Sequence, residues 1–244
     1  MPPALNRLRA IACPLMRDNI DTDALIPTSE NTRVAVAGYS ESLFAFWRYQ
    51  DLALREPNPA FVLNNPAYSS AKILLSGANF GCGSSRESAV WALRDYGFRV
   101  IIAQSFNETF LRNCIANGVA PLMVDADVLY RVAEVLNTQP GTSLAIELTT
   151  SRIKVLTLPE WCFDFELDPY YRDLLVAGRT EKETLENYTS DINVLRQNRA
   201  KLFPYLAVPD LTVVPQYIVT GEPRSEPQNT DSRSVEQQRA GHQP

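Results

Sequence analysis

The sequence predicts an α/β fold, with a central βαβαβ parallel core and additional antiparallel strands. In the middle of this 244-residue chain, three short apolar runs alternate with two amphipathic segments. Three further strand-like segments then follow one another with turns between them. Strands that alternate with helices favour a parallel sheet with right-handed crossovers, whereas strands joined by short turns favour antiparallel pairing.

The elements of the parallel core follow from the apolar pattern. The expected strands are Lys72–Gly77, Phe98–Ser105 and Val119–Val124, and the expected helices are Arg86–Gly97 and one ending at Asn117–Gly118. Ser105 and Glu108 have the spacing of a capping box at the start of the second helix. Gly97 supplies the stop of the first helix, because glycine readily adopts the conformation that ends helices.

The remaining elements surround this core. A helix is expected to begin at Asp125, followed by antiparallel strands within 142–150, 152–158 and 161–167, and by helices over Asp168–Ala177 and Glu181–Phe203. The proline-rich stretch 30–70 is predicted to be an ordered insertion with a short helix near Glu41–Trp47. One domain is expected over residues 1–220, and a disordered polar tail over 221–244.

Composition excludes several classes of chemistry. The chain has one histidine, His242, in the polar tail, so histidine-based triads and histidine metal sites are not expected. The four cysteines form no CxxC pair, and no metal site is predicted in this chain. A net charge of −5 predicts no nucleic-acid partner, and the lack of a long apolar run predicts no membrane partner. We expect a cytoplasmic protein with reduced cysteines.

The loop 79–87, with the sequence NFGCGSSRE, is the strongest candidate for a binding site. Glycines let a backbone approach a ligand closely, and the start of the next helix offers free N–H groups. Arg86 can bind a carboxylate through two hydrogen bonds. These features predict an anion pocket for a small carboxylate. The alternative is that Ser84 simply caps the helix, since Ser84 and Glu87 have the spacing of a capping box.

Three motifs resemble one known family. The segment NFGCGSSRESAVWALRDYGFRVIIAQSF is similar to the signature of the small subunit of 3-isopropylmalate dehydratase, the swivelling domain of the aconitase superfamily. NIDTDALIP (Asn19–Pro27) and PNPAFVLNNP (Pro57–Pro66) resemble two further motifs of that family. The resemblance extends from about residue 8 to about residue 205 and implies a swivelling β/β/α domain.

The resemblance also implies roles for individual residues. Ser84 would be the catalytic base, and Asp23 would lie near the reaction centre. Substrate-binding positions would be Ser85, Arg86, Gly83 and Asn79. In this family a partner large subunit holds a [4Fe-4S] cluster, and the small subunit closes over the carboxylate substrate. Without the family, Asp18, Asp21 and Asp23 would be interpreted as turn formers and helix caps.

One departure from the family bears directly on function. The family usually has a histidine two residues after the Ser-Ser-Arg triplet, and this chain has Ser88 there. The sequence therefore leaves three hypotheses. The first is a small subunit that isomerises 2-isopropylmalate to 3-isopropylmalate together with an iron–sulfur large subunit. The second is a repurposed standalone isomerase, dehydratase or cyclase of a biosynthetic pathway, without a cluster. The third is a non-catalytic binding subunit.

Overall fold

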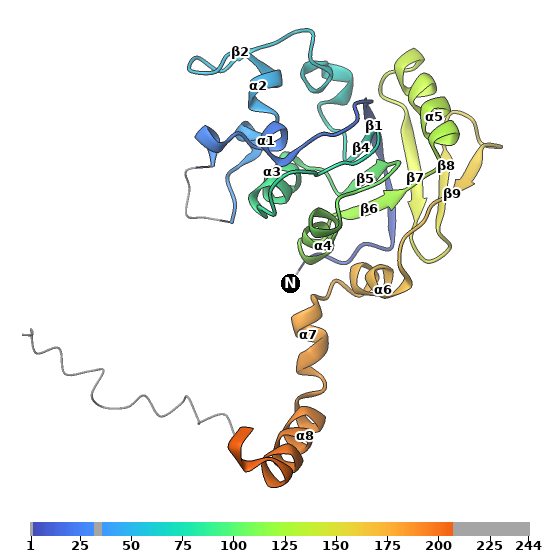
Figure 1. Cartoon of the computed structure of the whole chain (residues 1–244). Helices are drawn as coiled ribbons and strands as arrows, with labels where there is room; N and C mark the ends of the chain where they lie inside the picture. Colours follow the sequence, from blue (N-terminus) through green and yellow to red (C-terminus); the bar gives the residue numbers. More distant parts are fainter. Residues whose placement is uncertain (1, 32–35, 207–244) are drawn as a thin grey trace, which may run out of the picture. The chain divides into compact units, whose positions relative to one another are not determined.

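The computed structural model describes residues 2–31 and 36–206. The chain divides into two units, residues 1–189 and residues 190–244. The first unit contains the sheet and its covering helices (Figure 1). In the second unit, the described part consists of most of helix α8 (Thr189–Leu202) and a 3₁₀ turn at Pro204–Leu206. The predicted tail 221–244, with His242, lies outside the described residues, and the domain boundary at 220 stays a prediction.

Within the described residues, seven strands form one mixed sheet in the order β6-β5-β4-β1-β7-β8-β9 (Figure 1). The strands are β1 (Arg7–Leu15), β4 (Ile73–Ser76), β5 (Val100–Ala103), β6 (Ala120–Met123), β7 (Ser143–Glu147), β8 (Arg152–Val155) and β9 (Cys162–Asp164). Strands β1, β4, β5 and β6 are parallel, and β7, β8 and β9 extend the sheet antiparallel. The predicted fold class is confirmed.

Strand β1 joins the two halves of the sheet. Its residues Ala12–Leu15 pair in parallel with β4, while Arg7–Ile11 pair antiparallel with β7. The sequence interpretation did not include this strand. Its first half is partly exposed and its second half fully buried, so it shows neither clean alternation nor one continuous apolar run. A two-stranded ribbon, β2 (Tyr49–Asp51) with β3 (Glu56–Pro57), stands apart from this sheet.

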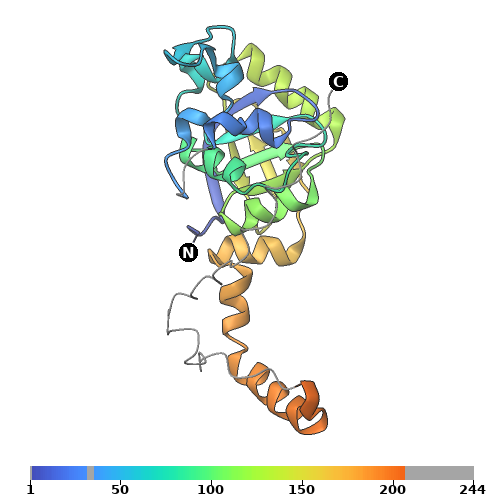
Figure 2. The ribbon, with the colours of Figure 1, turned by 60° about the vertical axis from the view of Figure 1, so that its left-hand side comes forward.

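Helices cover both faces of the sheet (Figure 2). These helices are α3 (Ser88–Tyr96), α4 (Glu108–Ala116), α5 (Ala126–Thr138) and α6 (Pro169–Ala177). Leu74 of β4 packs in one core cluster with α3, whereas its neighbours Ile73 and Leu75 pack in the other cluster with α5 and α6. A strand buried on both faces must be apolar throughout, which explains the continuous run in the sequence.

Two local predictions are wrong. Helix α4 is capped by Asn107, whose side chain accepts hydrogen bonds from the N–H groups of Thr109 and Phe110, and not by Ser105. Ser105 Oγ instead accepts a hydrogen bond from Asn79 N–H at 2.8 Å. The single helix expected over Glu181–Phe203 is two helices, α7 (Glu181–Glu186) and α8. The predicted start of α5 at Asp125 and end of α3 at Gly97 are confirmed.

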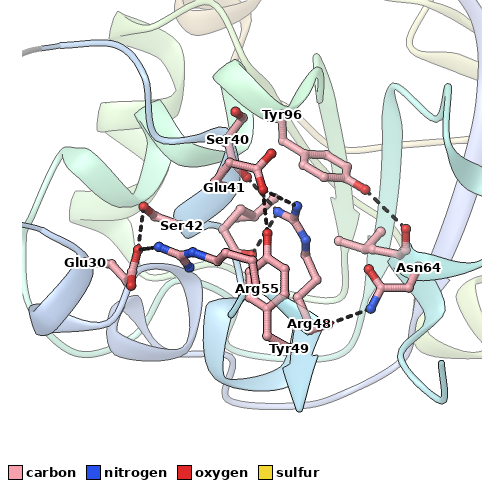
Figure 3. A network of polar contacts seen from close by, with 11 residues as sticks. Glu30, Ser40, Glu41, Ser42, Arg48, Tyr49, Arg55, Asn64 and Tyr96 are labelled. Atoms are coloured by element: carbon pink, nitrogen blue, oxygen red, sulfur yellow. Dashed lines mark hydrogen bonds and ion pairs between the residues drawn. The ribbon is translucent and has the colours of Figure 1, made fainter. Parts of the chain in front are cut away.

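A network of polar side chains holds the insertion 30–70 together (Figure 3). Glu30 Oε2 accepts hydrogen bonds from Arg55 Nη2 at 2.6 Å and from Ser42 Oγ at 3.0 Å. Glu41 Oε2 accepts one from the Tyr49 hydroxyl at 2.6 Å. Burial and this hydrogen bond raise the pKa of Tyr49 to about 12. These side-chain contacts therefore add to the backbone hydrogen bonds of the short turns in this insertion.

The short helix predicted near Glu41–Trp47 is present in this insertion as a 3₁₀ turn at Ser40–Ser42 followed by α2 (Ala45–Arg48). Arg48, the last residue of α2, is buried. Its guanidinium carbon lies 5.0 Å from the ring centroid of Tyr49 and 5.1 Å from that of Tyr96. These cation–π contacts, the hydrogen bond from Nη1 to Ser40 C=O at 2.6 Å and the ion pair with Glu41 offset the cost of removing the charge from water.

Candidate functional site

The loop 79–87 and the NIDTD segment lie side by side, joined by backbone hydrogen bonds. Gly81 N–H donates to Ile20 C=O at 2.7 Å, and Thr22 N–H donates to Cys82 C=O at 2.9 Å. Asp21 and Cys82 form a parallel bridge between these contacts. Two motifs that are some sixty residues apart in the sequence thus form one site.

The three aspartates of the upstream motif have different roles. Asp21 Oδ1 accepts a hydrogen bond from Ala24 N–H at 2.7 Å and caps α1 (Thr22–Leu25). Asp18 Oδ1 accepts one from Ala78 N–H at 2.7 Å. The interpretation as a helix cap is therefore confirmed for Asp21, whereas Asp18 binds a backbone N–H sixty residues away rather than one in its own turn. Asp23 differs, because its side chain is exposed and pairs with Arg86.

Ser84 lies in the middle of a hydrogen-bonded cluster. Arg86 Nε donates to Ser84 Oγ at 2.7 Å, and Thr22 Oγ1 lies 3.1 Å from the same oxygen. Helix α3 begins only at Ser88, with Glu87 at its N-cap position and no side-chain cap. The interpretation of Ser84 as the helix cap is therefore wrong.

The guanidinium of Arg86 is fixed on two of its three nitrogens. Nη1 donates to Asp23 Oδ1 at 2.7 Å, to Ile26 C=O at 3.2 Å and to Thr28 Oγ1 at 3.4 Å. Nε is occupied by Ser84. In the part of the chain that the structure describes, Nη2 has no hydrogen-bond partner. Nη2 is therefore the guanidinium nitrogen that is left for a carboxylate ligand.

The other predicted binding residues lie in the same loop but differ in their contacts. Gly83 has φ +93° and is exposed, with Thr22 beside it. Ser85 is also exposed, and its carbonyl accepts a hydrogen bond from Asn113. Asn79 Nδ2 donates to Asn19 Oδ1 at 2.8 Å rather than to Ser84 or Arg86. The substrate-binding roles of these three residues stay predictions.

Helix α3 and the residue before it are anchored by hydrogen bonds to Asn117. Glu87 Oε1 accepts a hydrogen bond from Asn117 Nδ2 at 2.6 Å, and Trp91 and Arg94 donate to Asn117 Oδ1 at 3.1 and 3.2 Å. Asn117 thereby ties α3 to the end of α4. This places Glu87 outside the Ser84 cluster and fixes the helix that follows the loop.

Ser88, which stands where the family usually has a histidine, is buried in the first turn of α3. Its Oγ has no hydrogen-bond partner within the residues that the structure describes. Leaving a buried hydroxyl unsatisfied costs roughly 1–3 kcal/mol. The Ser88 hydroxyl is therefore not hydrogen-bonded to Ser84 or Arg86, and its burial opposes folding.

Three of the four cysteines, Cys13, Cys82 and Cys114, are poor nucleophiles in this structure. All four are free. Burial, followed by the nearby charge of Asp21, raises the pKa of Cys82, and burial alone raises that of Cys13 to about 12 and that of Cys114 well above its ordinary value. Among the described residues, no three His, Cys, Asp or Glu side chains come together as a metal site. None of the described helices is long and apolar enough to span a membrane.

Thr22 contacts Ser84, and it was not among the site residues predicted from the sequence. Thr22 lies inside the NIDTD motif, but nothing in the sequence of that motif indicates that the Thr22 hydroxyl contacts Ser84. Only the pairing of the two loops brings these hydroxyls together, and that pairing is a long-range contact. A threonine between two aspartates in the sequence is otherwise typical of a turn.

Comparison with known proteins places the chain in a family. The model of the aconitase C-terminal domain matches residues 3–127. The 3-isopropylmalate dehydratase small subunit of Magnetococcus marinus is 39% identical over 210 residues, covering 83% of this chain and 97% of that protein. The one from Cupriavidus necator is 42% identical over 170 residues, covering 70% and 81%.

A solved structure shows the same fold. The crystal structure of the 3-isopropylmalate dehydratase LeuD from Methanocaldococcus jannaschii matches with a TM-score of 0.54 and 24% identity. The match covers 79% of this chain and 99% of that one. Together, the loop that carries Ser84 and Arg86, the mixed sheet beneath it and these relatives agree with the resemblance found in the sequence. The chain therefore belongs to the family of 3-isopropylmalate dehydratase small subunits, which are built on the aconitase C-terminal domain.

Proposed function

We propose that this chain is the small subunit of a 3-isopropylmalate dehydratase, a hydro-lyase that converts 2-isopropylmalate to 3-isopropylmalate together with an iron–sulfur large subunit. The observation that carries the proposal is the contact of Arg86 Nε with Ser84 Oγ at 2.7 Å. It places a fixed positive charge beside the hydroxyl that the family motif identifies as the base. The relatives at about 40% identity, each a small subunit of this enzyme, support the same assignment.

The chemistry requires a base next to a bound carboxylate. In the first half of the reaction, a carbon next to a carboxylate loses its proton and the neighbouring carbon loses its hydroxyl, so that water leaves and a double bond forms. Ser84, as its alkoxide, takes that proton. A guanidinium that donates to Oγ stabilises the alkoxide and lowers the pKa of the hydroxyl. Addition of water in the other orientation then gives the isomer, with no change in oxidation state.

Arg86 serves both the base and the substrate. Its Nε holds Ser84, and its pairing with Asp23 fixes the plane of the guanidinium. Nη2 is left to bind a substrate carboxylate, so that the acidic C–H next to that carboxylate is held close to Ser84. Such positioning is a major part of catalysis, because it removes the entropic cost of bringing the groups together.

A partner is needed for two physical reasons. Gly83, Ser84 and Ser85 are exposed, so this chain alone leaves the base in water. A surface that closes over the loop would exclude water and strengthen the contacts of Arg86. The second reason is the iron–sulfur cluster, which in this family belongs to the large subunit. When bound there, the cluster supplies a Lewis acid for the leaving hydroxyl. The free cysteines suit a cytoplasmic enzyme.

A second candidate function rests on Ser88. The loss of the family's histidine at this buried position favours an enzyme whose site has changed, such as a standalone biosynthetic isomerase, dehydratase or cyclase that acts on a carboxylate without a cluster. Such an enzyme would use the same Ser84 and Arg86, but it would need its own means of covering the loop.

The two functions are separated by reconstitution. The purified chain is mixed with the cluster-loaded large subunit from its own organism, and 2-isopropylmalate is followed through its unsaturated intermediate. We expect turnover only when both chains are present, and a loss of at least about 10²-fold with Ser84→Ala, as for removal of a general base. Thr142→Val, outside the site, is the control for folding and should remain active. Absence of both complex and activity would overturn the proposal, and turnover by the chain alone would favour the second candidate.

A further inference from the structure

Thr22 is the one group besides Arg86 whose side chain contacts Ser84 Oγ within the described residues. We infer that Thr22 is a positioning residue that donates the second hydrogen bond to Ser84 Oγ, so that Thr22 and Arg86 together hold the serine in its alkoxide form. The catalytic consequence rests on the proposed function. The hydrogen bond itself does not, and it can be tested in the isolated chain.

The direction of the hydrogen bond follows from the neighbouring contacts. Ser84 N–H donates to Thr22 Oγ1 at 3.1 Å, so the threonine oxygen already accepts a bond from the serine's own backbone. Its hydroxyl hydrogen remains free to be donated, and Ser84 Oγ lies 3.1 Å away. Because Arg86 Nε also donates to Ser84 Oγ, the serine receives two donors. The proton of a neutral Ser84 is then left for the open side of the loop.

Thr22 is held in place more firmly than a surface hydroxyl. It is only 1% exposed, whereas Ser84 is exposed. Its backbone N–H donates to Cys82 C=O, and its C=O accepts from Ile26 N–H at 3.0 Å. Asp21 caps the short helix that Thr22 begins. A donor fixed before the reaction stabilises developing charge without reorganisation, which is the basis of electrostatic catalysis.

The two donors complement each other electrically. Arg86 contributes a full charge, but its guanidinium is also shared with Asp23, whose carboxylate offsets part of the field. Thr22 contributes a neutral dipole on the buried side of Ser84, where water cannot substitute for it. Removal of a hydrogen bond to a charged group lowers the equilibrium constant for forming the charged state by about 10-fold or more. Thr22→Val should therefore act mainly on the acidity of residue 84.

The first test measures that acidity without any partner. In the Ser84→Cys variant of the full chain, the pH dependence of iodoacetamide alkylation at position 84 is followed by tandem mass spectrometry, whose fragment ions separate this thiol from Cys82 on the same peptide. We expect a thiol pKa below the ordinary value of about 8.5. Adding Thr22→Val should raise it by about one unit, and Thr22→Ser should leave it close to the starting value.

A matched control distinguishes this effect from loss of any buried threonine hydroxyl. Thr142 is also buried, and its Oγ1 donates to Gln139 C=O at 2.7 Å, outside the site. Thr142→Val should leave the thiol pKa at position 84 unchanged. If Thr22→Val changes that pKa no more than Thr142→Val does, the inference is wrong, whatever the activity of the complex.

The second test uses the complex with the large subunit. Thr22→Val should lower kcat by about 10-fold or more and move the ascending, acidic limb of the kcat profile to higher pH, because the base must be deprotonated to act. KM should stay nearly unchanged, because Thr22 contacts Ser84 and not the Arg86 Nη2 that would bind the substrate carboxylate. Thr22→Ser should restore the profile. A rise in KM alone would contradict the role. If the wild-type complex is inactive, the proposed function fails, and the thiol titration still decides the inference about Thr22.

Discussion

Gly81 lies directly against the ring of Phe110: a Cβ added to the glycine would fall 2.1 Å from Phe110 Cγ. Phe110 is 2% exposed and packs against Phe80 with ring centroids 5.5 Å apart. The loop that carries Ser84 therefore rests on α4 at a point where only a glycine fits. The same glycine donates its N–H to Ile20, so one residue joins the loop, the helix and the NIDTD segment.

Gly81→Ala should destabilise the protein by about 3 kcal/mol, because it adds a clash with a buried ring to a backbone with φ +75°. Gly97→Ala is the matched control. Its φ is +121°, but nothing lies within 4 Å of the added Cβ, so only backbone strain of roughly 1–2 kcal/mol is expected. Urea unfolding of the two variants measures the difference. Equal losses would show that Phe110 moves away freely.

Arg86→Lys should lower kcat/KM by about 10²-fold or more, with both a higher KM and a lower kcat. A lysine keeps the charge, but one ammonium cannot reach Ser84, Asp23 and a substrate carboxylate in the planar arrangement of a guanidinium. Arg112→Lys, at an exposed arginine paired with Glu108 on α4, should leave both constants unchanged. Steady-state kinetics of the reconstituted complex provide the measurement. A variant that loses only substrate affinity would mean that Arg86 does not serve Ser84.

Ser88→Ala should stabilise the protein by about 1 kcal/mol, because it removes a buried hydroxyl that has no partner in the described structure. The matched control is Ser76→Ala. Ser76 is equally buried, but its Oγ donates to Arg17 C=O at 3.1 Å, so its removal should cost about 1 kcal/mol. Opposite signs in urea unfolding are expected. A loss at both positions would indicate that Ser88 Oγ is hydrogen-bonded after all.

Stability should fall at alkaline pH through Cys13. Burial raises the pKa of this thiol from 9.0 to about 12, so the unfolded chain releases the proton first as pH rises. The contribution of Cys13 to the free energy of unfolding is thus fully present below about pH 9 and is lost progressively towards pH 12. Cys13→Ala should make the free energy of unfolding depend less steeply on pH between about pH 8 and about pH 10.5. Cys162→Ala, at an exposed position, serves as the control. An unchanged slope in Cys13→Ala would contradict the prediction.

The parallel core was predictable because its signals are local. Ile73, Leu74 and Leu75 form an unbroken apolar run, and Gly97 and Asp125 mark helix ends by their own conformational preferences. The Ser-Ser-Arg loop was recognisable for the same reason. Its residues are contiguous, so their spacing and their chemistry are visible together in the sequence.

The remaining features depend on contacts between distant segments. Asn107 caps helix α4 in place of the predicted pair Ser105 and Glu108, because the Ser105 side chain is hydrogen-bonded to Asn79 of the site loop. Ser84 likewise has capping spacing with Glu87, but it turns towards Thr22 instead. In both cases a tertiary partner outcompetes a local cap that is worth about 1 kcal/mol. No local pattern reports such a partner, so Thr22 could not be identified from the sequence.

The position of β1 has a consequence for how the chain folds. This first strand is made early in synthesis, yet its two partners are β4 and β7, and β7 belongs to the second half of the sheet. Until residues 143–147 have left the ribosome, the edge of β1 that faces β7 stays unpaired and open to aggregation. The NIDTD segment follows β1 directly and cannot meet its own partner loop before residues 79–87 are made. Both halves of the site are therefore made while the edge of β1 that pairs with β7 is still open.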